Sequence, residues 1–259
     1  MDLIKTKTFK EFKIIEYEIG HGTTGRVLLG QWLVEPKQYV AVKEINIKLI
    51  ENDEMKMKQI ANEINSLRSV ESPYIVKLYG SVQTDNNLYM FLEYCEDGDL
   101  KAYISKRQGP LTEPEAVLMV LTQLAFFRHI VEGFKELQKN NIIHRDIKPA
   151  NILLKQNTAK ISDFGFSRVL ANADQSAIMT LLGTPLYTAP EILNGTTVVT
   201  QDRSLMRNAM SGHWVLYCTK CSTERLLGRE PSWKISERIY KSPNFYLAYR
   251  SVVNPSKIF

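Results

Sequence analysis

Two short stretches of this chain hold residue types that move phosphoryl groups. The first runs from His144 to Asn151 and includes Asp146 and Lys148, and the second is Asp163-Phe164-Gly165. An aspartate can orient an attacking hydroxyl and accept its proton, and a nearby lysine can balance charge on the transferred phosphate. Asn151 and Asp163 offer the oxygen ligands that Mg²⁺ prefers. Together the stretches predict phosphoryl transfer from ATP, with Asp146 and Lys148 as catalytic residues and Asn151 and Asp163 as metal ligands.

A glycine-rich loop lies nearer the N-terminus. It reads Ile19, Gly20, His21, Gly22, Thr23, Thr24, Gly25, Arg26, Val27. Glycines let a backbone close over phosphates because no Cβ stands in the way. The same spacing occurs in dinucleotide-binding folds and in ordinary glycine hairpins. A dinucleotide fold needs a helix directly after the glycines, whereas apolar runs typical of strands lie on both sides here. We expect this loop to bind ATP, with an ordinary hairpin as the alternative.

Lys43 ends the apolar run Tyr39–Val42, and Glu63 is its expected partner. Ile60 and Leu67 recur at helical spacing, with Glu63 on the same stripe. A carboxylate on the inner side of that helix can pair with the lysine and hold its ammonium against the α- and β-phosphates. A solvated strand end for Lys43 and an exposed helix charge for Glu63 are the alternatives.

The period of the apolar residues predicts the elements that must position these groups. Expected strands lie within 12–47, at 75–79 and at 88–94, with a turn at 85–87; expected helices lie within 51–70, at 99–106 and from 113 to about 139. Thr112 is the expected N-cap of the last helix, with Pro114 just inside it, and Asn140-Asn141 ends it. A strand-rich part therefore precedes a helix-rich part, with the chemistry at their junction.

Residues 12–192 resemble the catalytic region of eukaryotic serine/threonine protein kinases. The resemblance rests on His-Arg-Asp-x-Lys-x-x-Asn, Asp-Phe-Gly, the glycine-rich loop and Val-Ala-Val-Lys. It implies an α+β, bilobal fold, with a β-rich N-lobe carrying one helix over about 12–93 and a mainly α-helical C-lobe from about 96. It also implies ATP and Mg²⁺ as cofactors and a protein substrate that accepts phosphate on serine or threonine.

The same resemblance assigns the residues around the adenine ring. Val27, Ala41 and Leu153 would sandwich the ring, and Glu93 and Cys95 would offer backbone hydrogen bonds, with Leu92 as the gatekeeper. The segments 91–100, 163–168 and 183–191 are similar to those of the Unc-51-like kinases, which initiate autophagy. Calcium/calmodulin-type and NIMA-like kinases share much of the sequence of these segments.

Arg145, directly before Asp146, implies control by phosphorylation, because an arginine at that place needs an anion to fix it. Thr180 and Thr184 are the expected sites for an upstream activating kinase, with an unmodified loop as the alternative.

Composition and charge argue against several other classes. The net charge is +5, but residues 192–259 hold ten Lys or Arg and four Asp or Glu, so the positive excess lies in that segment. Those charges are scattered without a recognisable module, so we expect no nucleic-acid binding. The longest apolar stretch, 116–127, is too short to span a bilayer. Three cysteines make no disulfide framework, and we expect a cytoplasmic protein.

Residues 193–259 depart from the kinase pattern, which places a helix with Asp-x-Trp-x-x-Gly after Ala189-Pro190-Glu191. Reading the third base of each codon with the first two of the next, from Ala209 onward, permits Asp-Val-Trp-Ser-Leu-Gly-Val-Leu-Leu-Tyr-Glu-Met. In that frame His213–Trp214 forces Leu, Trp214–Val215 forces Gly and Tyr217–Cys218 forces Leu. We hypothesise that 193–259 is a frame-shifted segment and that the C-lobe is incomplete. The alternative for this segment is a divergent but genuine sequence. The alternative for the function is a catalytically impaired, truncated kinase that acts as a nucleotide-binding or interaction module.

Overall fold

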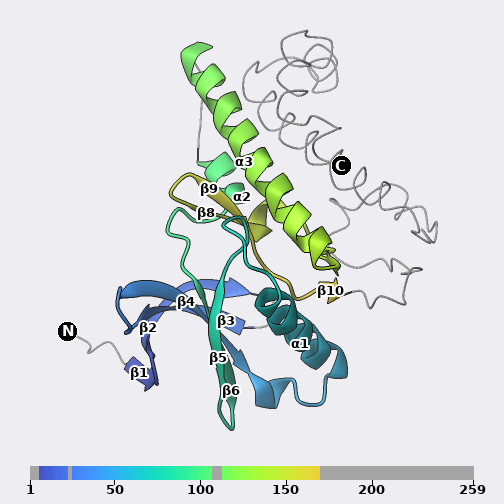
Figure 1. Cartoon of the computed structure of the whole chain (residues 1–259). Coiled ribbons are helices and arrows are strands. Elements are labelled where there is room, and N and C mark those ends of the chain that lie inside the picture. Colours follow the sequence, from blue (N-terminus) through green and yellow to red (C-terminus); the bar gives the residue numbers. More distant parts are fainter. Residues whose placement is uncertain (1–5, 23–24, 107–112, 170–259) are drawn as a thin grey trace.

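The computed structural model describes residues 6–22, 25–106 and 113–169 (Figure 1). The predictions for Thr23, Thr24, the Thr112 cap, Thr180 and Thr184, and those for residues 193–259, lie outside the described residues. Within the described ranges the chain has a strand-rich part followed by a helix-rich part, so the expected α+β arrangement is confirmed.

The strand-rich part is one six-stranded antiparallel sheet in the order β1-β2-β3-β4-β6-β5. Its strands are β1 (Thr6–Phe9), β2 (Phe12–Gly22), β3 (Gly25–Trp32), β4 (Gln38–Asn46), β5 (Leu78–Gln83) and β6 (Asn87–Glu93). Strand β1 was not predicted. It is a short, exposed edge strand, and Phe9, whose ring centroid lies 5.0 Å from that of Tyr89, ties it to the sheet.

The two faces of this sheet bury different sets of residues, as strand alternation requires. One face packs into an aromatic-rich cluster around Phe12, Val40, Val42 and Phe91, in which the Phe12 and Phe91 rings stack at 4.0 Å. On β4 the alternate positions Ala41, Lys43 and Ile45 point to the opposite face. The sheet therefore presents Lys43 on the side where the helix and the helix-rich part lie.

Helix α1 (Glu54–Arg68) follows the short 3-10 turn η1 (Ile47–Leu49). Asp53 caps it, because its side chain accepts a hydrogen bond from the Lys56 amide at 3.0 Å. The buried residues of α1 are Ile60, Glu63, Ser66 and Leu67, which form one stripe. The stripe thus includes one acidic side chain and one hydroxyl beside two apolar side chains.

The predicted strand at 75–79 is wrong in position: β5 begins at Leu78. The Val76 amide donates to the Ile161 carbonyl at 2.9 Å, and the Ile161 amide donates to the Tyr74 carbonyl at 2.9 Å. Ile75 and Val76 are buried because they join the core of the helix-rich part. Ile75 and Val76 are therefore apolar because they pack in the core of the helix-rich part, and not because they belong to a strand of the large sheet.

The helix-rich part holds two helices and several short strands. These are α2 (Leu100–Ser105), α3 (Glu113–Lys139), β7 (Ile142–Ile143), η2 (Pro149–Asn151), β8 (Ile152–Lys155), β9 (Thr158–Ile161) and β10 (Arg168–Val169). Asp99 caps α2 by accepting from the Ala102 amide at 2.7 Å. Helix α3 runs beside the β8–β9 hairpin in Figure 1 and ends at Lys139, two residues before Asn141, which has a positive φ of 55°. Over the described part of the chain, no helix combines the length and apolar character that crossing a bilayer needs.

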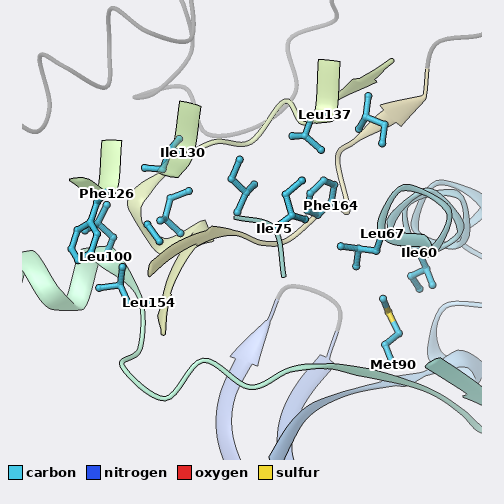
Figure 2. Packing of buried hydrophobic residues seen from close by; sticks show 14 of the residues in the cluster. Ile60, Leu67, Ile75, Met90, Leu100, Phe126, Ile130, Leu137, Leu154 and Phe164 are labelled. Atoms are coloured by element: carbon cyan, nitrogen blue, oxygen red, sulfur yellow. The ribbon is translucent and has the colours of Figure 1, made fainter. Parts of the chain in front are cut away.

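One hydrophobic cluster joins the two parts. Met90 of the sheet and Ile60 and Leu67 of α1 face Phe164, and the cluster continues through Ile75 to Ile130 and Leu137 of α3 (Figure 2). The segments from His144 to Asp163 therefore lie where two packed bodies meet.

Candidate active site

Lys43 of β4 and Glu63 of α1 form the most buried ion pair among the described residues. The Lys43 Nζ donates to both carboxylate oxygens of Glu63 at 2.7 Å. Lys43 is 8% exposed and Glu63 is 2% exposed. The expected pair is present, and the alternatives of a solvated strand end and an exposed helix charge are wrong.

Electrostatics keep Lys43 charged. Burial alone lowers the pKa of its ammonium, but the carboxylates of Glu63 and Asp163 outweigh burial and raise that pKa. Burial, aided by Asp163, raises the pKa of the Glu63 carboxyl, although Lys43 opposes the rise. Asp163 thus faces the pair closely enough to act on both members, and three of the predicted site residues share one electrostatic environment.

The segment from His144 to Asn151 is a loop with a buried aspartate at its centre. Asp146 is 3% exposed. The Lys148 Nζ donates to its Oδ2 at 2.7 Å, and the Asn151 Nδ2 donates to the same oxygen at 2.9 Å and to the Asp146 carbonyl at 2.8 Å. Pro149 stands in the first turn of η2 and starts it directly after Lys148. The carboxylate is therefore held by two neighbours of its own loop.

Asn151 and Asp163 are brought together by Ser162. The Ser162 amide and hydroxyl both donate to the Asn151 carbonyl at 2.9 Å. Asp163 has a φ of 62°, a backbone conformation that costs energy for a residue with a side chain and is common at functional sites. The two Asn151 Nδ2 hydrogen bonds fix its amide group, so Oδ1 is the atom it can offer to a metal.

Within the described ranges no three His, Cys, Asp or Glu residues cluster as a metal cage. A site for Mg²⁺ does not need one, because this ion keeps several waters and takes one or two protein ligands together with substrate phosphates. The amide oxygen of Asn151 and the carboxylate of Asp163 have the chemistry that such a site requires.

His144 links the two stretches. Burial lowers the pKa of its imidazole, so the ring is neutral. Its Nε2 lies 3.0 Å from the Ser162 carbonyl, which can only accept, so Nε2 carries the proton. Its Nδ1 accepts from the Asp146 amide at 3.3 Å, and its ring meets Phe164 edge-on at 4.8 Å.

The glycine-rich loop joins β2 to β3, with Gly22 paired to Gly25 and Gly20 to Val27. No helix follows the glycines, so the dinucleotide alternative is wrong. A Cβ on Gly25 would lie 2.0 Å from the Glu44 carbonyl oxygen, so a side chain there meets the next strand. The guanidinium of Arg26 pairs with Glu44. Ile19 and Val27, at the two ends of this loop, are half-buried.

Residues 93–99 connect the two parts beside β8. Leu153 bridges to Asp99, and the Leu154 amide donates to the Gly98 carbonyl at 2.8 Å. The Glu93 amide donates to the Lys77 carbonyl at 2.8 Å, and the Cys95 thiol donates to the Glu93 carbonyl, with its Sγ 4.0 Å from that oxygen.

Two further expected residues of the adenine site lie around this connection. Ala41 pairs with Leu92 across β4 and β6. Burial, with the Glu93 carboxylate, raises the pKa of the Cys95 thiol to about 12, so the thiol stays neutral. The expected adenine residues therefore come from both sides of the junction.

Comparison with known proteins decides the family. A family model of the protein kinase domain matches residues 14–205. The chain belongs to the protein kinase family. This kinase is 34% identical to MAP3K epsilon protein kinase 1 of Brassica napus over 83% of this chain and 15% of the relative. It is 39% identical to the serine/threonine-protein kinase ATG1a of Arabidopsis thaliana over 60% of this chain and 23% of the relative.

A third relative, the SNF1-like protein kinase ssp2 of Schizosaccharomyces pombe, is 34% identical over 70% of this chain and 30% of its own length. The kinase spans less than a third of the length of each of these three relatives. The chain is therefore similar to an ATG1-type kinase, and it is also similar to MAP3K and SNF1-like kinases.

Sequence reasoning missed contacts at three places in this kinase. The Glu93 carboxylate lies 3.1 Å from the ammonium groups of both Lys155 and Lys160. The Arg145 Nε donates to the Phe166 carbonyl at 2.6 Å, so a backbone oxygen is one of its partners. At the third place a contact joins the hydroxyls of Ser66 and Ser167. All of these contacts link residues far apart in the chain, and no local spacing signals them.

Proposed function

We propose that this protein kinase domain transfers the γ-phosphate of ATP to serine or threonine hydroxyls of proteins. One arrangement carries the proposal: the Lys43–Glu63 pair faces Asp163, and Asp146 is held by Lys148 and Asn151 in the neighbouring loop. The names of the ATG1-type relatives support the serine/threonine class.

Each residue has a part in this proposal that follows from its surroundings. Lys43, kept charged and held by Glu63, binds the α- and β-phosphates. Asp146 orients the attacking hydroxyl and accepts its proton late, since a loose transition state asks little of the nucleophile. Lys148 brings positive charge to the transferred group. Mg²⁺, held by Asn151 and Asp163, would neutralise the charge of the phosphates.

The glycine-rich loop and the connection at 93–99 complete the nucleotide site. Val27, Ala41 and Leu153 would enclose the adenine, and the Glu93 carbonyl and the Cys95 backbone would hydrogen-bond its edge.

The wider setting is also proposed. A role in autophagy is supported by the ATG1 relatives. Control by an upstream kinase that phosphorylates Thr180 or Thr184 is supported by the position of Arg145 directly before Asp146. A cytoplasmic location is supported by the three cysteines without a disulfide framework.

A second candidate function is a nucleotide-binding or interaction module without transfer activity. It is favoured by the sequence after Glu191, which lacks the Asp-x-Trp-x-x-Gly expected there. That motif would anchor the loop that carries Asp146.

A phosphotransfer assay separates the two functions. The full chain is incubated with γ-labelled ATP, Mg²⁺ and casein, beside Asp163→Ala, and nucleotide binding is measured in parallel. Transfer by the unchanged chain that Asp163→Ala abolishes supports the kinase. Binding without transfer supports the module, and neither binding nor transfer overturns both.

A further inference from the structure

A hydrogen bond between two buried hydroxyls joins α1 to the segment after Asp163-Phe164-Gly165. The Oγ atoms of Ser66 and Ser167 lie 2.7 Å apart, and both residues are fully buried. The residues are 101 positions apart in the chain. Buried hydroxyls are costly unless paired, so each serine holds the other in place.

The positions of the two serines relate them to the active site. Ser66 lies one helical turn after Glu63, on the same buried stripe of α1. Ser167 closes the turn that follows Asp163, because its amide donates to the Phe164 carbonyl at 2.9 Å. The contact therefore links the helix that carries Glu63 to the turn that carries Asp163.

Apolar packing already brings these segments together, since Leu67 and Phe164 belong to one core cluster. Packing of this kind is not directional, whereas a hydrogen bond in a low-dielectric interior fixes distance and orientation. A Cβ on Gly165 would lie 3.4 Å from the Asp163 Oδ1 and 3.9 Å from the Glu63 Oε2, so the two carboxylates approach the same backbone.

We propose that Ser66 and Ser167 are positioning residues that fix the Asp163 turn against α1, so that Asp163 faces the Lys43–Glu63 pair. The functional consequence rests on the proposed phosphotransfer function: without the contact, Mg²⁺-dependent binding of ATP weakens. The two serines touch neither nucleotide nor metal in this proposal and act through Asp163.

The chain offers variants that separate positioning from stability. Ser66→Ala keeps α1 intact, because alanine is the better helix former. It leaves the Ser167 hydroxyl buried without its partner. The double variant Ser66→Ala/Ser167→Ala removes both hydroxyls and so restores much of the stability lost in either single variant. Ser69→Ala is the matched control, since Ser69 donates to the Ser66 carbonyl at 2.9 Å near the same helix end without touching the turn.

The first test needs no nucleotide. Hydrogen exchange of the full chain is followed by mass spectrometry in peptides that cover 163–169 and 60–68. We expect Ser66→Ala to speed exchange in 163–169, and Ser167→Ala to speed it in 60–68, each about three- to tenfold. Ser69→Ala leaves 163–169 unchanged. Unchanged exchange across the contact in both single variants, or rapid exchange of 163–169 in the unmodified chain, overturns the proposal.

The second test measures affinity for a fluorescent ATP analogue with and without Mg²⁺. We expect the single variants and the double variant to lose about three- to tenfold in affinity with Mg²⁺ and little without it. The double variant regains melting temperature but not affinity. Affinity that recovers together with stability in the double variant would show a structural role only. If the unmodified chain binds no nucleotide, the proposed function fails, and the exchange experiment still decides whether the contact positions the turn.

Discussion

At the scale of single residues, the buried charged side chains of the described ranges are all paired. Lys43 is paired with Glu63, Lys160 with Glu93 and Asp146 with Lys148. Taking one charge of such a pair away leaves the other buried without compensation. The ion pairs Lys43–Glu63 and Asp146–Lys148 therefore both stabilise the fold and position the residues that are proposed to act on ATP.

Replacing Glu63 by glutamine removes the carboxylate that holds Lys43. We expect Glu63→Gln to lower the free energy of unfolding by about 3 kcal/mol, because a buried ammonium loses its partner. Glu71→Gln is the control: the Lys77–Glu71 pair is exposed, and its loss changes stability by less than about 1 kcal/mol. Urea unfolding measures both, and equal effects of the two variants would contradict the assignment of Lys43 and Glu63 as a buried pair.

Acidification is expected to weaken nucleotide binding before it unfolds the protein. Burial raises the pKa of Glu63 above its ordinary value of 4.5, so this carboxyl takes up a proton while other carboxylates remain charged. Protonated Glu63 no longer neutralises and orients Lys43.

The measurement is Mg²⁺-ATP affinity as the pH is lowered from 7 toward 5, compared with Glu63→Gln. Because Glu63→Gln has no carboxyl at this position, any loss of affinity in this variant as the pH falls comes from protonation of the nucleotide itself. The unmodified chain should lose affinity more steeply than this variant. Parallel pH profiles for the two proteins would show that Glu63 does not titrate in this range.

At the scale of elements, the glycine-rich loop shows why two glycines of one motif differ. A Cβ at Gly25 would lie 2.0 Å from the Glu44 carbonyl oxygen on β4, whereas a Cβ at Gly20 meets only the Val27 Cβ, at 4.0 Å. Gly25 is therefore required by the packing of β3 on β4, and Gly20 is not.

We expect Gly25→Ala to push β3 from β4 and destabilise the protein by about 2 kcal/mol or more, since backbone rather than a flexible side chain is in the way. Gly20→Ala, the matched variant in the same loop, should change stability by less than about 1 kcal/mol. Thermal unfolding compares them, and a tolerated Gly25→Ala would contradict the close approach of the two strands.

Periodicity was enough to predict most of the elements near the site. Helix α1 and the Lys43–Glu63 pair followed from the stripe of Ile60, Glu63 and Leu67, because a helix places such residues on one face. The start of β5 was misplaced because Ile75 and Val76 are apolar for a different core. The Ser66–Ser167 contact could not be predicted, since serine at a buried position gives no local signal.

At the scale of the whole molecule, one cluster joins the sheet, α1 and α3 through Phe164 and its neighbours (Figure 2). The bilobal kinase arrangement predicted from the sequence is the one that the described residues adopt, with the active site at the junction. The frame-shift hypothesis for 193–259 lies outside the described residues and remains a prediction.

That hypothesis has a direct check at the level of the transcript. Sequencing across codons 192–212 should reveal a changed reading frame, after which the coding sequence gives Asp-x-Trp-x-x-Gly. A continuous, well-supported reading frame through these codons would contradict the frame-shift hypothesis, and 193–259 would then be a genuine and divergent part of the kinase.

The most direct test is to incubate the full chain with γ-labelled ATP, Mg²⁺ and a protein substrate and to identify which amino acid of the substrate carries the label. We predict label on serine or threonine, and a rate at least about 100-fold lower for Asp146→Asn, which keeps the shape of the loop but removes the base. Label on tyrosine, or transfer that is unchanged in Asp146→Asn, would contradict the assignment of Asp146 and of the serine/threonine class.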